Sequence, residues 1–133
     1  MTKSSLKPIL NSSLPPSFRQ IRIELAREQE HPAGSHNIAY ILVAPLDDDG
    51  CIDPKIWQQH REACRVARLR PGEDPMHGHL VHRRGGSWAF EYADVPDEVG
   101  YRFNEEHFVL GEYVSVTEEG STHPFRVVSV ARL

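Results

Sequence analysis

Three histidines in the segment MHGHLVH, residues 76–82, are the side chains best suited to chemistry in this sequence. An imidazole can ligate a metal ion, exchange a proton or hydrogen-bond a ligand near neutral pH. Gly85-Gly86 follows between two runs rich in β-formers, which predicts a β-hairpin with a two-residue turn. In the register of such a hairpin, His77 and His79 share the aromatic face and His82 lies on the other face.

The histidine pair has predicted neighbours across this hairpin. The register places His77 opposite Asp94 and His79 opposite Tyr92. We expect Arg61 and Arg65 to approach the same rim from a neighbouring helix. Guanidinium groups beside neutral imidazoles favour a small anionic ligand, or the carboxylates or phosphates of a protein partner. The sequence therefore predicts a ligand site at this rim.

A helix is predicted from about Pro54 to Arg68. Asp53 supplies an N-cap carboxylate and Pro54 suits the first helical position, while Pro71 and Gly72 follow the helix end.

The predicted helix carries a possible metal ligand pair. His60 and Cys64 lie four residues apart on its inward face. If they pack near His77 and His79, the four side chains form a Cys-His₃ set suited to zinc. The alternative is a half-buried stripe without metal, because a free cysteine behaves as a small apolar residue.

Three classes of function follow from these residues. A binding or accessory domain without catalysis is the first prediction. A zinc-dependent or thiol-dependent enzyme is the alternative, with Cys64 as nucleophile and His60 or His77 as base, although a mid-helix thiol is poorly placed for activation. The third is a structural homodimer that buries apolar strand-edge residues near Val128 and Val130.

The remaining patterns are mostly those of strands. Residues 21–27 alternate apolar and polar, residues 37–44 are apolar on both faces, and residues 112–118 and 125–130 form a second predicted hairpin. Strands and one helix without a βαβ rhythm predict an α+β fold. We expect a curved antiparallel sheet or a small β-barrel of about six strands, with one packed α-helix.

Length and charge restrict the class of protein. The chain has 133 residues, which suits one domain over residues 18–133 after a Ser/Pro-rich flexible leader of residues 1–17. No stretch approaches the roughly 20 apolar residues of a membrane helix. A net charge of −4 argues against a general nucleic-acid binder. Residues 61–84 nevertheless hold six arginines against three acidic side chains, which predicts a basic patch.

The two cysteines, Cys51 and Cys64, are too few for a disulfide scaffold. The first residues lack the apolar core of a secretory signal. We therefore expect a cytoplasmic protein with reduced thiols.

Four segments together resemble a family of short bacterial proteins of unknown function: residues 77–80 (HGHL), 86–90 (GSWAF), 111–115 (GEYVS) and 125–130 (FRVVSV). The resemblance implies a bacterial, cytoplasmic protein and covers most of the chain after the leader. It brings no catalytic or binding residues with it.

Overall fold

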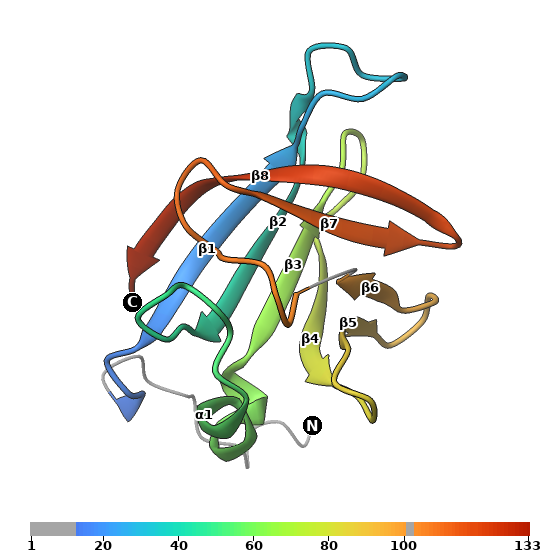
Figure 1. Cartoon of the computed structure of the whole chain (residues 1–133). Coiled ribbons are helices and arrows are strands. Elements are labelled where there is room, and N and C mark those ends of the chain that lie inside the picture. Colours follow the sequence, from blue (N-terminus) through green and yellow to red (C-terminus); the bar gives the residue numbers. More distant parts are fainter. Residues whose placement is uncertain (1–12, 101–102) are drawn as a thin grey trace.

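The computed structural model describes residues 13–100 and 103–133, and it shows eight antiparallel strands that close into a barrel. The strands are β1 (Phe18–Leu25), β2 (Ser35–Pro45), β3 (Arg65–Leu69), β4 (Met76–His82), β5 (Trp88–Tyr92), β6 (Glu98–Gly100), β7 (Tyr113–Glu118) and β8 (Ser121–Arg132). Each strand pairs with the next along the chain, and β8 returns to pair with β1 (Figure 1). The predicted barrel is therefore confirmed, with eight strands rather than about six.

Alternation along each strand fills the barrel interior. In β1, for example, Ile21, Ile23 and Leu25 are buried while the residues between them are partly exposed. In a barrel of this size, inward side chains from all strands meet and pack together. Buried apolar residues of every strand except β6 accordingly form one continuous hydrophobic core.

The helix is much shorter than predicted. Helix α1 covers Pro54–Gln59, followed by the single 3₁₀ turn Arg61–Ala63, and Arg65–Leu69 is strand β3. The predicted start is confirmed, because the Asp53 carboxylate accepts hydrogen bonds from the backbone N–H groups of Lys55 (3.0 Å) and Ile56 (3.2 Å). The predicted end is wrong: pairing of β3 with β2 and β4 overrides the helical pattern. The fold is consequently mostly β rather than α+β.

One end of the barrel is closed by α1. Trp57 is buried there, its indole N–H donates to the backbone carbonyl of Leu80 at 2.8 Å, and its ring meets Trp88 edge-on at 5.5 Å. Figure 1 shows α1 below the barrel, while the connections from β1 to β2 and from β3 to β4 lie at the opposite end. The barrel therefore has one end plugged by aromatic side chains and one end bordered by loops.

The hairpin of β4 and β5 differs from the predicted register by one residue. His82 pairs with Trp88, and the Arg83 N–H donates to the Ser87 carbonyl at 2.8 Å, so the loop is Arg84-Gly85-Gly86 rather than a two-residue turn. Both glycines do adopt the expected positive φ, 90° and 89°. A register shift of one residue exchanges the two faces of a strand, and here it does so.

The predicted leader covers residues 1–17, and residues 1–12 lie outside the described residues. The leader therefore stays a prediction. Among the described residues, no helix combines the length and apolar character needed to cross a membrane.

Candidate ligand site at the open end of the barrel

The exchanged register turns the histidine pair outward. His77 and His79 are exposed on the outer surface of β4, whereas Leu80 is buried. The predicted facing pairs are wrong, because His79 lies opposite Glu91 and Tyr92 lies opposite Gly78. The inward histidine of this strand is His82, which stacks on Trp88 with ring centroids 4.1 Å apart.

Five of the six residues predicted as a ligand rim are divided between two surface depressions. His77, Tyr92 and Asp94 border one of them, and Arg61 and His79 border the other. Arg65 pairs with His79 across the sheet. Binding of a small anion or a protein partner at these outer positions stays a prediction.

The residues predicted to bind zinc do not form one cluster. His60 meets Phe18 edge-on at 5.7 Å, and the buried Cys64 thiol contacts the His60 backbone carbonyl at 3.4 Å. His77 lies opposite Ala67 on the outer face of β4. Within residues 13–100 and 103–133, no three His, Cys, Asp or Glu side chains are grouped so that they could hold a metal ion.

Burial also affects the thiols. Removal of the Cys64 thiol from water raises its pKa to about 12, and the nearby charge of Arg65 only partly offsets this effect. The pKa of Cys51 is also raised, first by partial burial and then by Asp47 and Asp49. Neither shift favours the thiolate that a nucleophile needs.

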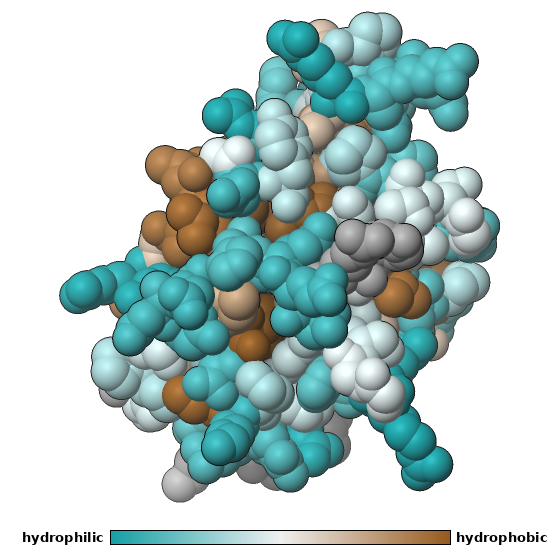
Figure 2. Space-filling model, in the orientation of Figure 1, coloured by the Kyte–Doolittle hydropathy of each residue, from teal (hydrophilic) through white to brown (hydrophobic). Residues whose placement is uncertain are grey.

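The apolar strand edge expected near Val128 and Val130 is partly occupied. β8 pairs with β1 from Phe125 to Arg132, where Val130 lies opposite Ile21, and it pairs with β7 from Ser121 to Arg126. Among the described residues, the large apolar side chains that are exposed are those of Val109, Leu110, Tyr113 and Leu133. Figure 2 shows apolar side chains gathered at the upper left of the view, over the segment that leads into β7. A homodimer stays a prediction.

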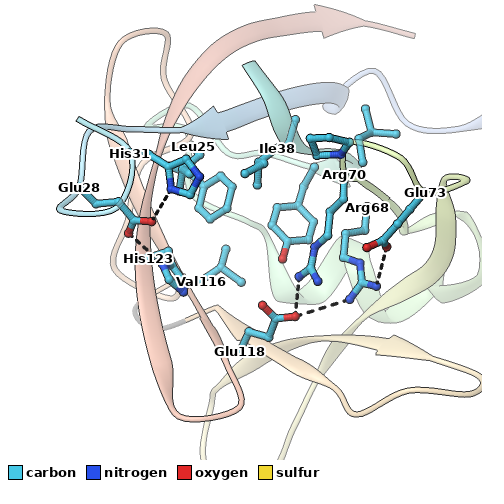
Figure 3. Close-up of a pocket in the computed structure, with 15 residues that line it drawn as sticks. Leu25, Glu28, His31, Ile38, Arg68, Arg70, Glu73, Val116, Glu118 and His123 are labelled. Carbon is cyan, nitrogen blue, oxygen red and sulfur yellow. Dashed lines mark hydrogen bonds and ion pairs between the residues drawn. The ribbon is translucent and has the colours of Figure 1, made fainter. Parts of the chain in front are cut away.

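A cavity of about 320 Å³ lies at the open end of the barrel, opposite α1 (Figure 3). Its wall is largely apolar and includes the following side chains from five strands and one loop: Leu25, Ile38, Ala39, Tyr40, Leu69, Pro71, Val116 and Phe125. Two groups of charged and polar side chains lie on either side of this wall, one around Arg68 and Arg70 and one around Glu28.

The first polar group is built on the buried carboxylate of Glu98, which is 1% exposed. Its Oε1 accepts hydrogen bonds from the hydroxyls of Tyr40 (2.9 Å) and Tyr92 (2.7 Å). Its Oε2 accepts from Arg68 (3.1 Å) and Arg70 (3.2 Å). Burial of a charge is tolerated when it is paired and hydrogen-bonded, and Glu98 meets both conditions.

Glu118 extends this group toward the cavity. Its Oε2 accepts a hydrogen bond from Arg70 Nη2 at 2.5 Å and lies 3.7 Å from Arg68. Partial burial acts to raise the pKa of the Glu118 carboxyl, but the hydrogen bond and charge of Arg70 outweigh it and hold this pKa below its ordinary value. Arg70 uses one nitrogen for both carboxylates, and its Nε and Nη1 form no hydrogen bond with the described part of the chain.

Burial and the neighbouring charge of Glu98 raise the pKa of both Tyr40 and Tyr92 well above the ordinary value. Both hydroxyls therefore stay protonated at neutral pH and act as donors to Glu98.

The second polar group joins the loop after β1 to β8. One carboxylate, that of Glu28, contacts Nδ1 of His31 at 3.4 Å and Nδ1 of His123 at 2.8 Å. Figure 3 shows both rings between this carboxylate and the cavity. The two histidines belong to separate segments, so the contact ties the open end together.

This cavity was not found by sequence reasoning. The sequence predicts Arg68 as the last residue of a helix and Arg70 beyond its end, and it predicts no strand at Glu98. A usable signal does exist: if Val66 to Arg70 is a strand, Val66, Arg68 and Arg70 share its inward face. No local sequence motif marks Glu98 as a partner of the other side chains in this group. Tyr40, for example, is 58 residues away from it in sequence.

The chain matches none of the protein-family models, curated proteins or solved structures with which it was compared.

Proposed function

We propose that this protein binds a small molecule in the open end of its barrel. One observation carries the proposal: α1 and the aromatic core fill one end, whereas the other end holds a cavity of about 320 Å³ with an apolar wall. Eight-stranded barrels are just wide enough to hold one small ligand. Small-molecule sites are commonly apolar concavities of roughly 300–1,000 Å³ with a few fixed polar groups.

The polar groups are held in place before any ligand arrives. Arg70 is fixed by Glu98 and Glu118, and Tyr40 is fixed by Glu98. Groups locked by such a network lose little conformational freedom on binding, so they contribute to affinity and orientation. This supports the predicted role as a binding or accessory domain, with the site moved from the outer rim of His77 to the open end.

An uncharged fluorescent probe tests the proposal. N-phenyl-1-naphthylamine is expected to bind the purified protein and to gain fluorescence in the apolar cavity. Ile38→Trp should abolish this gain, because Ile38 borders the cavity and the larger ring fills it. Ile41→Trp is the matched control, since Ile41 lies on the other face of the same strand and should leave binding unchanged.

Native mass spectrometry of freshly purified protein gives an independent readout. We expect an adduct of a co-purified small molecule that is absent from the Ile38→Trp variant. Equal probe fluorescence in wild type and Ile38→Trp, with both proteins folded, would contradict a ligand in this cavity.

A further inference from the structure

We infer that the ligand is an uncharged molecule with a hydrogen-bond acceptor at one end, a hydroxyl or N–H donor at the other and an apolar body between them. This inference rests on the proposed function and specifies the chemistry of the ligand. It follows from the donors and acceptors that the two polar groups leave unused, and from the charge that surrounds them.

The arginine side of the cavity offers a donor. Arg70 directs Nη2 to Glu98 and Glu118, and its other nitrogens form no hydrogen bond with the described residues. A guanidinium is a donor at every nitrogen and never an acceptor. The ligand end nearest Arg70 should therefore carry an acceptor such as a carbonyl oxygen.

The histidine side offers an acceptor. An ionised carboxylate only accepts hydrogen bonds, so the contacts of Glu28 assign the proton to Nδ1 of His31 and of His123. In an imidazole that carries its proton on Nδ1, Nε2 is an acceptor, and among the described residues neither Nε2 has a hydrogen-bond partner. The ligand end nearest the histidines should therefore carry an O–H or N–H donor.

Charge disfavours an anion. The cavity holds two guanidinium groups, Arg68 and Arg70, and more carboxylates than these: Glu73, Glu98 and Glu118 pair with the arginines, and Glu28 lies on the histidine side. A ligand carboxylate on Arg70 would lie beside the carboxylate of Glu118, which already binds this arginine at 2.5 Å. Repulsion among like charges in a partly buried cavity is stronger than in water. A cation would meet the two arginines instead, so an uncharged ligand suits the site best.

The apolar wall fits an aromatic or aliphatic body. Tyr40 and Phe125 border the cavity with ring centroids 5.1 Å apart, and Ile38 and Val116 add aliphatic surface. A ring inserted here gains apolar burial and edge contacts with these aromatics.

A matched set of four probes tests this inference by competition with bound N-phenyl-1-naphthylamine. N-acetyltyramine has the carbonyl, the ring and the hydroxyl, whereas N-acetylphenethylamine lacks the hydroxyl. Tyramine has a positive charge in place of the acetamide, and para-hydroxyphenylpropionate has a negative one. We expect N-acetyltyramine to bind tightest, with N-acetylphenethylamine weaker by roughly 3- to 10-fold, the usual effect of one hydrogen bond.

Variants locate the donor end of the ligand. His123→Phe should remove the preference for N-acetyltyramine over N-acetylphenethylamine, because the acceptor Nε2 is lost. His77→Phe is the matched control on the outer surface of β4 and should keep the preference. If His123→Phe does not fold, His31→Phe makes the same test on the second ring of this group.

The outcomes separate the inference from the function on which it rests. If either charged probe competes as well as N-acetyltyramine, or if none of the four competes while N-phenyl-1-naphthylamine binds, the ligand class is wrong and the binding site stands. If the preference for the hydroxyl survives in both histidine variants, the assigned acceptor is wrong. Failure of N-phenyl-1-naphthylamine itself to bind overturns the site and this inference with it.

Discussion

Glu118 couples the open-end network to pH. The pKa of its carboxyl is lower in the folded protein than its ordinary value of 4.5, because Arg70 outweighs the effect of burial. A carboxyl with a depressed folded pKa stabilises the fold above its unfolded pKa, and this contribution is lost as pH falls through the folded pKa. We therefore expect Glu118→Gln to lower the melting temperature near neutral pH, and we expect its difference from wild type to narrow as the pH falls below the ordinary value of 4.5.

Thermal unfolding of wild type and Glu118→Gln across this pH range measures the effect. Glu118 is partly exposed, so the difference near neutral pH should correspond to about 1 kcal/mol or less. Glu105→Gln, a change at an exposed carboxylate, is the control and should match wild type throughout. A difference for Glu118→Gln that does not narrow in acid would show that its charge does not stabilise the fold.

Cys64 should behave as a structural thiol. It is fully buried and burial raises its pKa to about 12, so almost no thiolate exists at neutral pH. With a thiol-reactive reagent, we expect Cys64 to react only after denaturation, whereas the partly exposed Cys51 reacts slowly in the native protein. Peptide mapping of labelled native and unfolded protein distinguishes the two. Rapid labelling of native Cys64 would instead support the predicted alternative, a thiol-dependent enzyme.

At the scale of one element, Gly78 explains why the segment MHGHLVH of β4 places His77 and His79 on the outer surface. A Cβ atom built on Gly78 would lie 2.4 Å from the backbone oxygen of Glu91 and 2.7 Å from the Tyr92 ring. The inward position between His77 and His79 therefore admits no side chain. We expect Gly78→Ala to destabilise the protein by roughly 1–3 kcal/mol, the usual cost of overpacking, as measured by denaturant unfolding.

His79→Ala is the companion change for this test. Because His79 is exposed on the outer face, we expect its loss to alter stability by less than about 0.5 kcal/mol. The reverse ranking of the two variants would favour the register with His77 and His79 inside.

Elements were predictable from sequence where local chemistry decides them. The N-cap of Asp53 and the positive φ of Gly85 and Gly86 depend on neighbouring residues alone, and both were expected. The number of residues in the loop between β4 and β5 and the end of α1 were not predicted correctly. Loops of two and of three residues differ by one residue in register, so they place opposite faces of β4 toward the core. Strand β3 forms because β2 and β4 pair with it from distant parts of the chain.

The candidate site is a property of the whole molecule, which is why sequence reasoning missed it. Its polar groups come from β2, β3, β5, β6, β7 and β8 and from the loops after β1 and β3, and closure of the barrel brings them together. No spacing along the chain encodes such a meeting. What the sequence did indicate was a small antiparallel barrel, and an eight-stranded barrel needs only an incompletely filled end to form a cavity.

Closure of the barrel also predicts which truncation unfolds the whole molecule. β8 pairs with β1 from Arg19↔Arg132 to Leu25↔Phe125, and this ladder joins the last strand to the first. A chain that ends at Arg126 loses most of this ladder and exposes the backbone N–H and carbonyl groups of β1. Unpaired strand edges promote association between chains. We expect the truncated chain to lose its cooperative thermal transition and to aggregate, as observed by circular dichroism and light scattering.

A chain lacking only Leu133, which lies beyond the ladder, should match the full chain in both measurements. If the chain ending at Arg126 instead stays monomeric with the melting temperature of the full chain, the other strand pairs hold the fold without closure, and the cavity does not depend on a complete barrel.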